Sequence, residues 1–341
     1  MEQDVTGAMR TTEGQEQERK QAQEPGEEDD GVVLDLTGSQ LHDLQQVELP
    51  LTLRELDLTA NRLAALDSRF ASLSSLCKLS LRQNLLSDES LAPLASWTSL
   101  SGLQELVLRD NKLTKLPNVE IFTNLRVFDV SFNEITTLRG LSKVSSTLQE
   151  LYVSKNEVVK MEELEHLHKL ELLELGSNKL RVMENLHNMV TLKELWLGRN
   201  RIRTVNLCGL NSLVKVSLQS NRLTSILGFQ DCVCLEELYL SHNGITKMEG
   251  LATLLNLRIL DLSSNKILCI EDIERLPRLE DLWLNDNQIA SLEGIEKAVV
   301  ESRSALTTIY IERNPCANEA HYASKLKALF PNLQQVDSVL F

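Results

Sequence analysis

The motif L-x-x-L-x-L-x-x-N returns along the chain, mostly every 21 to 23 residues, and this period restricts the possible folds more than any other feature. Its clearest copies are LRELDLTAN (53–61), LQELVLRDN (103–111), LQELYVSKN (148–156), LKELWLGRN (192–200), LEELYLSHN (235–243) and LEDLWLNDN (279–287). The closing asparagine falls at positions 61, 84, 111, 133, 156, 178, 200, 221, 243, 265, 287 and 314, with two longer steps of 27 residues. An earlier unit at 32–41 carries Ser39 in the asparagine position, which makes 13 units. A period held this long predicts a solenoid of stacked units.

The pattern is that of leucine-rich repeats, and each part of it has a physical reason. L-x-L predicts a short strand whose leucines point into the solenoid, and one unit cannot bury its apolar face without a stacked neighbour. The asparagine follows the strand, where its amide can bond backbone groups of the turn and of the adjacent coil. We therefore predict an α/β fold: a right-handed horseshoe with a concave parallel sheet of about 13 short strands and a C-terminal cap.

Three regions are predicted along the chain. Residues 1–30 hold ten acids, three bases and few side chains that could be buried, which is typical of a disordered acidic tail. A tail that binds a partner or is phosphorylated is the alternative. Residues 31–314 are assigned to the repeats and residues 315–341 to the cap.

Helical segments are expected at three places. Asn318 can begin a cap helix over 319–330, which Pro331 ends. The side chains expected to cover the last repeat are Leu326, Leu329 and Phe330. The two longer steps contain insertions of helical pattern at 85–102 and 293–306, expected on the convex side, with Trp97 packed in the first.

Charge and cysteine usage limit the compartment and the partners. The net charge of −14 and a pI of about 5.0 argue against nucleic acid or an anionic membrane as the main partner, since both require basic patches. No apolar run approaches a membrane span, and the first 30 residues have no secretory pattern. The six cysteines form no CxxC pair and are interpreted as reduced thiols in or near the core. We expect the protein in the nucleus and the cytoplasm.

No catalytic or ligand-binding motif is present. The six histidines are scattered, and the chain has no G-x-S-x-G, phosphate loop, HExxH or calcium-loop pattern. His166 and His168 are interpreted as surface residues. We expect no enzyme activity, no cofactor and no metal.

The residue between the two paired leucines of each strand is expected on the concave surface, because side chains alternate along a strand. These residues are Asp35, Asp57, Ser80, Val107, Asp129, Tyr152, Glu174, Trp196, Ser217, Tyr239, Asp261, Trp283 and Tyr310. Five of the seven Trp and Tyr residues of the chain fall in this row, with acids between them. Aromatics and arginines are enriched at interface centres, so the row predicts a protein-binding surface. The alternative is that the aromatics stack for stability; their alternate strands, about 10 Å apart, weaken this alternative.

The repeat wording resembles a known family. L-x-x-L-x-L-x-x-N-x-I-x-x-(I/M)-E-(G/N)-L, the stretch ITKMEGLATLLNLRILDLSSNKI (245–267) and the terminal E-R-N-P are similar to the leucine-rich-repeat regulatory subunit of type 1 protein serine/threonine phosphatase, known as the protein phosphatase 1 regulatory subunit 7 family. The resemblance covers about residues 32–341.

The resemblance implies a non-catalytic regulator that grips the phosphatase catalytic subunit with its concave face and controls its activity, maturation or targeting. It leaves room for a third inhibitor subunit. The contact residues that the resemblance implies are Asp129, Tyr152, Glu174, Trp196, Asp281, Trp283 and Tyr310. Tyr239 and Asp261 are added as candidates because they belong to the same row of middle strand positions.

Two other interpretations stay open. The chain could be a leucine-rich scaffold of a spliceosomal or axonemal complex, although such subunits usually have fewer repeats. It could also be a ubiquitin-ligase adaptor, although no F-box-like segment precedes the repeats.

Overall fold

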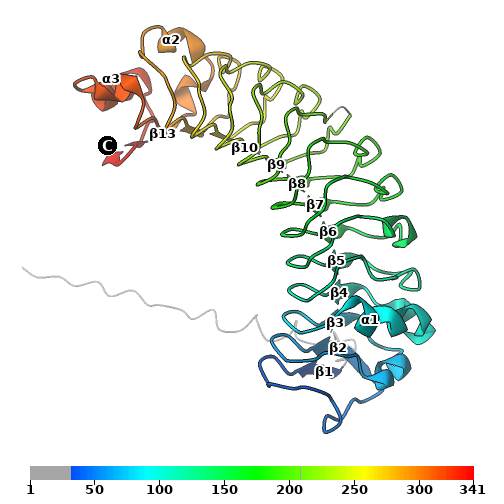
Figure 1. Ribbon diagram of the computed structural model, residues 1–341. Helices are drawn as coiled ribbons and strands as arrows, with labels where there is room; N and C mark the ends of the chain where they lie inside the picture. Colours follow the sequence, from blue (N-terminus) through cyan, green and yellow to red (C-terminus); the bar gives the residue numbers. More distant parts are fainter. Residues whose placement is uncertain (1–31, 208) are drawn as a thin grey trace, which may run out of the picture. The chain divides into compact units, whose positions relative to one another are not determined.

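A computed structural model describes residues 32–341 with the exception of residue 208, and the predicted tail lies outside these residues. Within residues 32–341, the strands form one 15-stranded sheet in sequence order along the inner side of a curved solenoid (Figure 1). The thirteen strands predicted from L-x-L are β1 (Val32–Asp35), β2 (Leu53–Asp57), β3 (Lys78–Ser80), β4 (Glu105–Val107), β5 (Val127–Asp129), β6 (Glu150–Tyr152), β7 (Leu172–Glu174), β8 (Glu194–Trp196), β9 (Lys215–Ser217), β10 (Glu237–Tyr239), β11 (Ile259–Asp261), β12 (Asp281–Trp283) and β13 (Thr308–Tyr310). The prediction of a leucine-rich-repeat solenoid is confirmed.

Strand alternation separates the core from the surface. Neighbouring strands from β1 to β13 are parallel, and from β2 onward equivalent residues of successive coils pair directly. The side chain of Leu195 in β8 is fully buried, whereas Glu194 and Trp196 on either side are half-buried on the opposite face. Repetition of this pattern stacks the leucines into one continuous core.

The repeated asparagines bond the coils to each other. Asn200 donates from Nδ2 to the carbonyl oxygens of Leu197 in its own turn (3.0 Å) and of Leu175 in the preceding coil (2.9 Å). Its Oδ1 accepts the backbone N–H of Leu180, also in the preceding coil (3.0 Å). The same three bonds recur at the other repeat asparagines, for example Asn265. The structural interpretation of this residue is therefore confirmed.

Each asparagine follows a tight turn. The residue before it has a left-handed φ in every repeat, for example 50° at Lys155 and 55° at Arg199. Few of these residues are glycine or asparagine, which tolerate that conformation best. The asparagine bonds therefore hold a turn that the local sequence alone does not favour.

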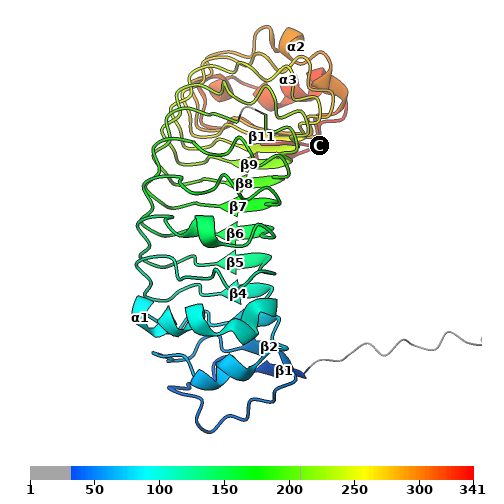
Figure 2. The same ribbon diagram turned by 90° about the vertical axis from the view of Figure 1, so that its right-hand side faces the viewer.

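Short helical segments lie on the convex side near the two ends of the solenoid and at one coil between them (Figure 2). The first insertion folds into α1 (Asp88–Leu91), η2 (Ala92–Ser96) and η3 (Thr98–Gly102), and the second into α2 (Ile295–Ala298) and η5 (Ser302–Ser304). Trp97 packs edge-on against Phe70 of η1 (Ser68–Ser72), with ring centroids 6.2 Å apart. The remaining convex segment is η4 (Leu141–Lys143). Both insertions thus lie where the repeat pattern predicted.

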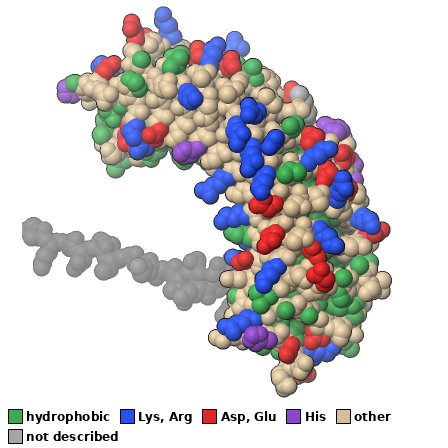
Figure 3. Space-filling view, in the orientation of Figure 1, with side chains coloured by type: hydrophobic (Ala, Val, Ile, Leu, Met, Phe, Trp, Pro, Cys, Tyr) green, Lys and Arg blue, Asp and Glu red, His purple; other side chains and the backbone are tan. Residues whose placement is uncertain are grey.

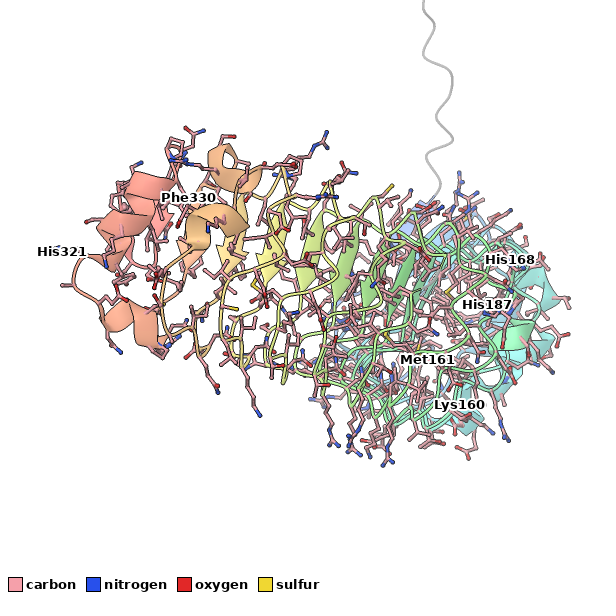
Figure 4. The ribbon with its side chains drawn as sticks, turned by 90° about the horizontal axis from the view of Figure 1, so that it is seen from above. Lys160, Met161, His168, His187, His321 and Phe330 are labelled. Carbon is pink, nitrogen blue, oxygen red and sulfur yellow. The ribbon has the colours of Figure 1, made fainter. Side chains whose placement is uncertain are left out.

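The cap differs from its prediction at both ends. Pro315–Asn318 forms the 3-10 helix η6, and the α-helix α3 begins only at Tyr322 and ends at Leu329. The predicted start at Asn318 is wrong because His321, at φ 65°, turns the chain before the helix. Phe330 follows α3 and, with Leu326, is fully buried against the last coil (Figure 4).

A terminal hairpin extends the sheet beyond the predicted strands. β14 (Gln335–Val336) pairs parallel to β13, and β15 (Val339–Leu340) pairs antiparallel to β14. The repeat pattern missed both strands because neither contains L-x-L. Asp337 lies between them, accepting from the backbone N–H groups of Ile311 and Glu312 and from the hydroxyl of Tyr322.

The cysteine interpretation is correct for two thiols and wrong for two others. Cys232 and Cys316 are buried, Cys77 is half-buried, and Cys234 and Cys269 are exposed. The exposed thiols lie outside the strands, at solvent-facing positions that the repeat does not reserve for apolar residues. Among the described residues, the helices are too short to cross a membrane.

Candidate partner-binding surface

The predicted concave residues form one row across nine neighbouring strands. In register from β5 to β13, the row reads Asp129, Tyr152, Glu174, Trp196, Ser217, Tyr239, Asp261, Trp283, Tyr310. Asp281 lies two residues before Trp283 on the same face. The structure therefore brings all nine candidate residues together on one surface of the sheet.

The row has two kinds of carboxylate. Asp129 and Asp261 are buried, and each accepts the backbone N–H two residues onward, at 2.8 and 3.0 Å. These two carboxylates are therefore occupied in bonding the backbone where their strands end. Glu174 and Asp281 are half-buried, and no ion pair or side-chain hydrogen bond joins either one to another residue in the described part of the chain. The second kind leaves negative charge on this face without a cation beside it in the described part of the chain.

In the middle of the row, each aromatic is fixed by an acid of its own strand. The Tyr152 hydroxyl donates to Glu150 at 2.7 Å, and Trp196 Nε1 donates to Glu194 at 3.0 Å. Lys215 Nζ lies 5.8 Å from the centroid of the Trp196 ring and pairs with Glu237 at 3.0 Å. These bonds hold the polar atoms of the rings while the ring faces stay half-exposed.

Tyr152 and Tyr239, whose hydroxyls each bond an acid of the same strand, are neutral at physiological pH. Burial raises the pKa of Tyr152 well above its ordinary value, and the hydrogen bond to Glu150 and its negative charge raise it further. Tyr239 has the same arrangement with Glu237, at 2.8 Å, and its pKa is raised for the same reasons. Both hydroxyls therefore remain hydrogen-bond donors.

Three aromatics of the C-terminal half contact each other. The ring centroids of Tyr239 and Trp283 are 6.3 Å apart, although β11 lies between their strands, and those of Trp283 and Tyr310 are 5.9 Å apart. The expectation that alternate strands keep the aromatics apart is wrong here. Asp261, on β11, is small and buried, so the larger rings meet above it. The three rings therefore stabilise one another on this face.

Trp283 carries an unpaired polar atom. Its Nε1 is buried and has no hydrogen-bond partner among the residues that the structure describes, unlike Nε1 of Trp196. A buried unpaired donor costs free energy, so Trp283 is held in place by ring packing rather than by its N–H group.

Phe132 is a surface residue that the sequence analysis missed. It precedes Asn133 in the turn after β5, with the Arg109 guanidinium carbon 4.2 Å and Lys155 Nζ 4.4 Å from its ring centroid. It does not occupy a middle strand position, so the row of middle residues does not include it. Its signal was available, because the residues before the other repeat asparagines are not aromatic.

The histidines do not converge. His168 and His187 lie on the convex side, away from the strands (Figure 4). In the part of the chain that the structure describes, no group of three or more His, Cys, Asp or Glu is arranged to hold a metal ion.

Comparisons with known proteins agree with this architecture. The family model described as "Leucine Rich repeats (2 copies)" matches residues 101–143, 235–275 and 255–297. An internalin of Listeria monocytogenes aligns over 81% of this chain and 86% of its own, with a TM-score of 0.65 and 20% identity. A leucine-rich-repeat protein of Leptospira interrogans, LIC12759, aligns over 89% and 95%, with a TM-score of 0.63 and 24% identity. At such identities the likeness concerns the fold alone.

One curated relative is similar along nearly its whole length. The chain is 64% identical over 320 residues to the Arabidopsis thaliana protein named "Protein phosphatase 1 regulatory inhibitor subunit PPP1R7 homolog". The alignment covers 93% of this chain and 98% of that relative.

Proposed function

The chain belongs to the family of leucine-rich-repeat regulatory inhibitor subunits of protein phosphatase 1, and we propose that it binds the catalytic subunit of that phosphatase through its concave face. As a member of this family it is a regulatory protein and not an enzyme. The finer proposal is that the bound subunit is controlled in its activity, maturation or targeting. A third inhibitor subunit is a further proposed partner, and the nucleus and cytoplasm are the proposed compartments.

The observation that carries this proposal is the continuous row from Asp129 to Tyr310. Its aromatic rings are half-exposed, and the carboxylates of Glu174 and Asp281 lack cationic partners among the described residues. Apolar ring faces favour burial by a partner, while carboxylates favour a partner with basic groups. The row crosses nine strands, which at about 4.8 Å per strand is on the order of 40 Å. Such a length suits a protein rather than a small ligand.

The buried residues of the row have a supporting part in this proposal. Asp129 and Asp261 hold the turns after their strands, and Arg109 lies 3.8 Å from Asp129. The contacts themselves would come from Tyr152, Glu174, Trp196, Tyr239, Asp281, Trp283 and Tyr310.

The test measures binding of the purified phosphatase catalytic subunit to the full chain by calorimetry. Trp196→Ala is expected to weaken binding by about 2–4 kcal/mol, because a central aromatic contact is lost. Its melting temperature should change little, since the ring is half-exposed. Leu255→Ala is the matched control, because Leu255 is 51% exposed on the convex side. Equal binding by Trp196→Ala and the parent chain would overturn the proposed surface.

A second experiment addresses the other scaffold interpretations. The tagged parent chain and the Trp196→Ala variant would be used to capture proteins from cell extract. The proposal expects the phosphatase catalytic subunit among proteins retained by the parent chain and depleted with the variant. Recovery of spliceosomal, axonemal or ubiquitin-ligase components without the phosphatase would favour the alternative. Fluorescent fusions imaged in cells test the proposed nuclear and cytoplasmic location.

A further inference from the structure

Five arginines lie together on one edge of the solenoid, at the turns and the extended segments that follow strands β7 to β9. They are Arg181, Arg199, Arg201, Arg203 and Arg222, and we call them the arginine edge. Figure 3 shows Lys and Arg side chains gathered over these coils, and Figure 4 shows nitrogen-tipped side chains extending from the same edge, where Lys160 is labelled.

The sequence around the arginine edge lacks acidic residues that could neutralise its charge. The chain has 49 Asp and Glu against 35 Lys and Arg, yet residues 195–230 contain no Asp or Glu. In the part of the chain that the structure describes, no ion pair joins any of the five arginines to a carboxylate. Other bases in equivalent turns are paired, as Lys179 is with Glu157 and Arg313 with Asp286. The edge is therefore a concentrated positive patch on an acidic protein.

The backbone arranges the arginines in a regular pattern. Along 199–203 the buried residues Asn200 and Ile202 alternate with Arg199, Arg201 and Arg203, which are exposed or half-buried. Arg199 lies in the left-handed turn before Asn200, and Arg201 and Arg203 follow that asparagine. Neighbouring coils continue the pattern, because the N–H of Arg222 bonds the carbonyl of Ile202 and the N–H of Arg201 bonds that of Leu180, both at 2.8 Å. The asparagine bonds described above hold this segment to its neighbours.

We propose that the arginine edge binds an extended acidic segment of a protein partner. A guanidinium group pairs with a carboxylate through two parallel hydrogen bonds, and its charge survives at every physiological pH. Side chains on one side of an extended peptide recur about every 7 Å, the spacing expected between Arg201 and Arg203, which flank the buried Ile202. The occupant is recognised by its carboxylates, independently of whether the concave face binds the phosphatase.

The residues of the arginine edge favour an acidic peptide over nucleic acid. Single-stranded nucleic acid is usually bound by aromatic side chains placed within the basic groove. The arginine edge contains none, since the segment 197–205 has no aromatic residue.

The experiment measures fluorescence anisotropy of a labelled Glu-Ser repeat peptide with the full chain at low salt. A Gln-Ser repeat of the same length and a polyuridylate RNA are the comparison probes. The proposal expects binding of the Glu-Ser peptide, weakening with added salt, and at least tenfold weaker binding of the other two probes. Tighter binding of the RNA, or no binding of the acidic peptide, would overturn it.

Substitutions of the arginines test whether the peptide binds at the arginine edge. Arg201→Glu, Arg203→Glu and Arg222→Glu together are expected to weaken peptide binding at least tenfold. The matched control is Arg62→Glu, Lys169→Glu and Arg275→Glu, which changes the net charge equally at exposed positions outside the edge. A triple Gln variant of the arginine edge replaces the Glu variant if the latter does not fold. Equal losses in the edge and control variants would mean that overall charge, not this site, binds the peptide.

Discussion

At the scale of single residues, the repeated asparagine is the side chain whose removal leaves most backbone groups unpaired. Asn200 is buried, and its side chain forms hydrogen bonds with the carbonyl oxygens of Leu175 and Leu197 and with the backbone N–H of Leu180. Asn200→Ala is therefore expected to lower the free energy of unfolding by about 2–4 kcal/mol. Urea denaturation followed by circular dichroism measures this change.

Asn221 provides the comparison for that prediction. It makes the same three bonds but is only partly buried, so water can replace part of them in the variant. Asn221→Ala should thus cost less than Asn200→Ala. A larger loss at Asn221 would mean that burial does not set the contribution of these amides.

Two substitutions of Trp283 distinguish the contribution of ring packing from that of hydrogen bonding on the concave face. Trp283→Ala removes contacts with Tyr239 and Tyr310 and should lower the free energy of unfolding by roughly 2–3 kcal/mol. Trp283→Phe keeps a ring and removes the unpaired Nε1, so it should retain most of the parent stability. Urea titrations of both variants test this, and a Phe variant as unstable as the Ala variant would show that the N–H group is needed.

The residue scale also shows what the sequence could predict. The direction of Trp196 followed from strand alternation, because Leu195 and Leu197 had to be buried. The contact between Tyr239 and Trp283 did not follow, because strand spacing fixes backbones but not how far large side chains lean over a small residue such as Asp261.

At the scale of secondary-structure elements, the repeats were predictable and the cap was less so. Each coil repeats the same burial pattern, so many copies define the period even where single copies deviate. The cap occurs once, and its helix start depends on the left-handed conformation of His321. The short strands β14 and β15 form because the edge of β13 needs backbone partners, and no side-chain pattern announces this.

A hydrogen bond between two residues of the cap depends on the protonation of Tyr322. The Tyr322 hydroxyl donates to Asp337 at 2.8 Å, and burial followed by this bond raises the pKa of Tyr322 from 10.0 to about 12. A folded-state pKa above that of the unfolded chain gives a stabilisation that is complete below pH 10 and is lost as the pH rises toward 12. Below pH 10, Tyr322→Phe should therefore be less stable than the parent chain.

The measurement compares urea unfolding of the two chains at pH 8 and near pH 11. The difference in free energy of unfolding should narrow at the higher pH, because Tyr322 ionises in the unfolded parent chain and this favours unfolding, whereas the Phe variant has no hydroxyl to ionise. A gap that stays constant with pH would show that the bond to Asp337 contributes little.

At the scale of the whole molecule, the free energy of unfolding depends on the contacts between neighbouring coils. Each coil contacts mainly its two neighbours, so the free energy is close to a sum of coil and interface contributions. Leu195 is fully buried in β8, near the middle of the array. Leu195→Ala is expected to lower the free energy of unfolding by about 2–5 kcal/mol, because it opens a cavity between β7 and β9.

The same variant tests how far a local defect extends. If contacts are mainly between neighbours, amide hydrogen exchange should accelerate most in the coils of β7, β8 and β9 and least near β2 and β13. Leu79→Ala, at a fully buried position in β3, is the matched control and should move the accelerated region toward the first coils. Uniform acceleration along residues 32–341 in both variants would instead mean that the solenoid unfolds as one cooperative unit. The concave row and the arginine edge would then lose their shape together, because both are built on β8 and its neighbours.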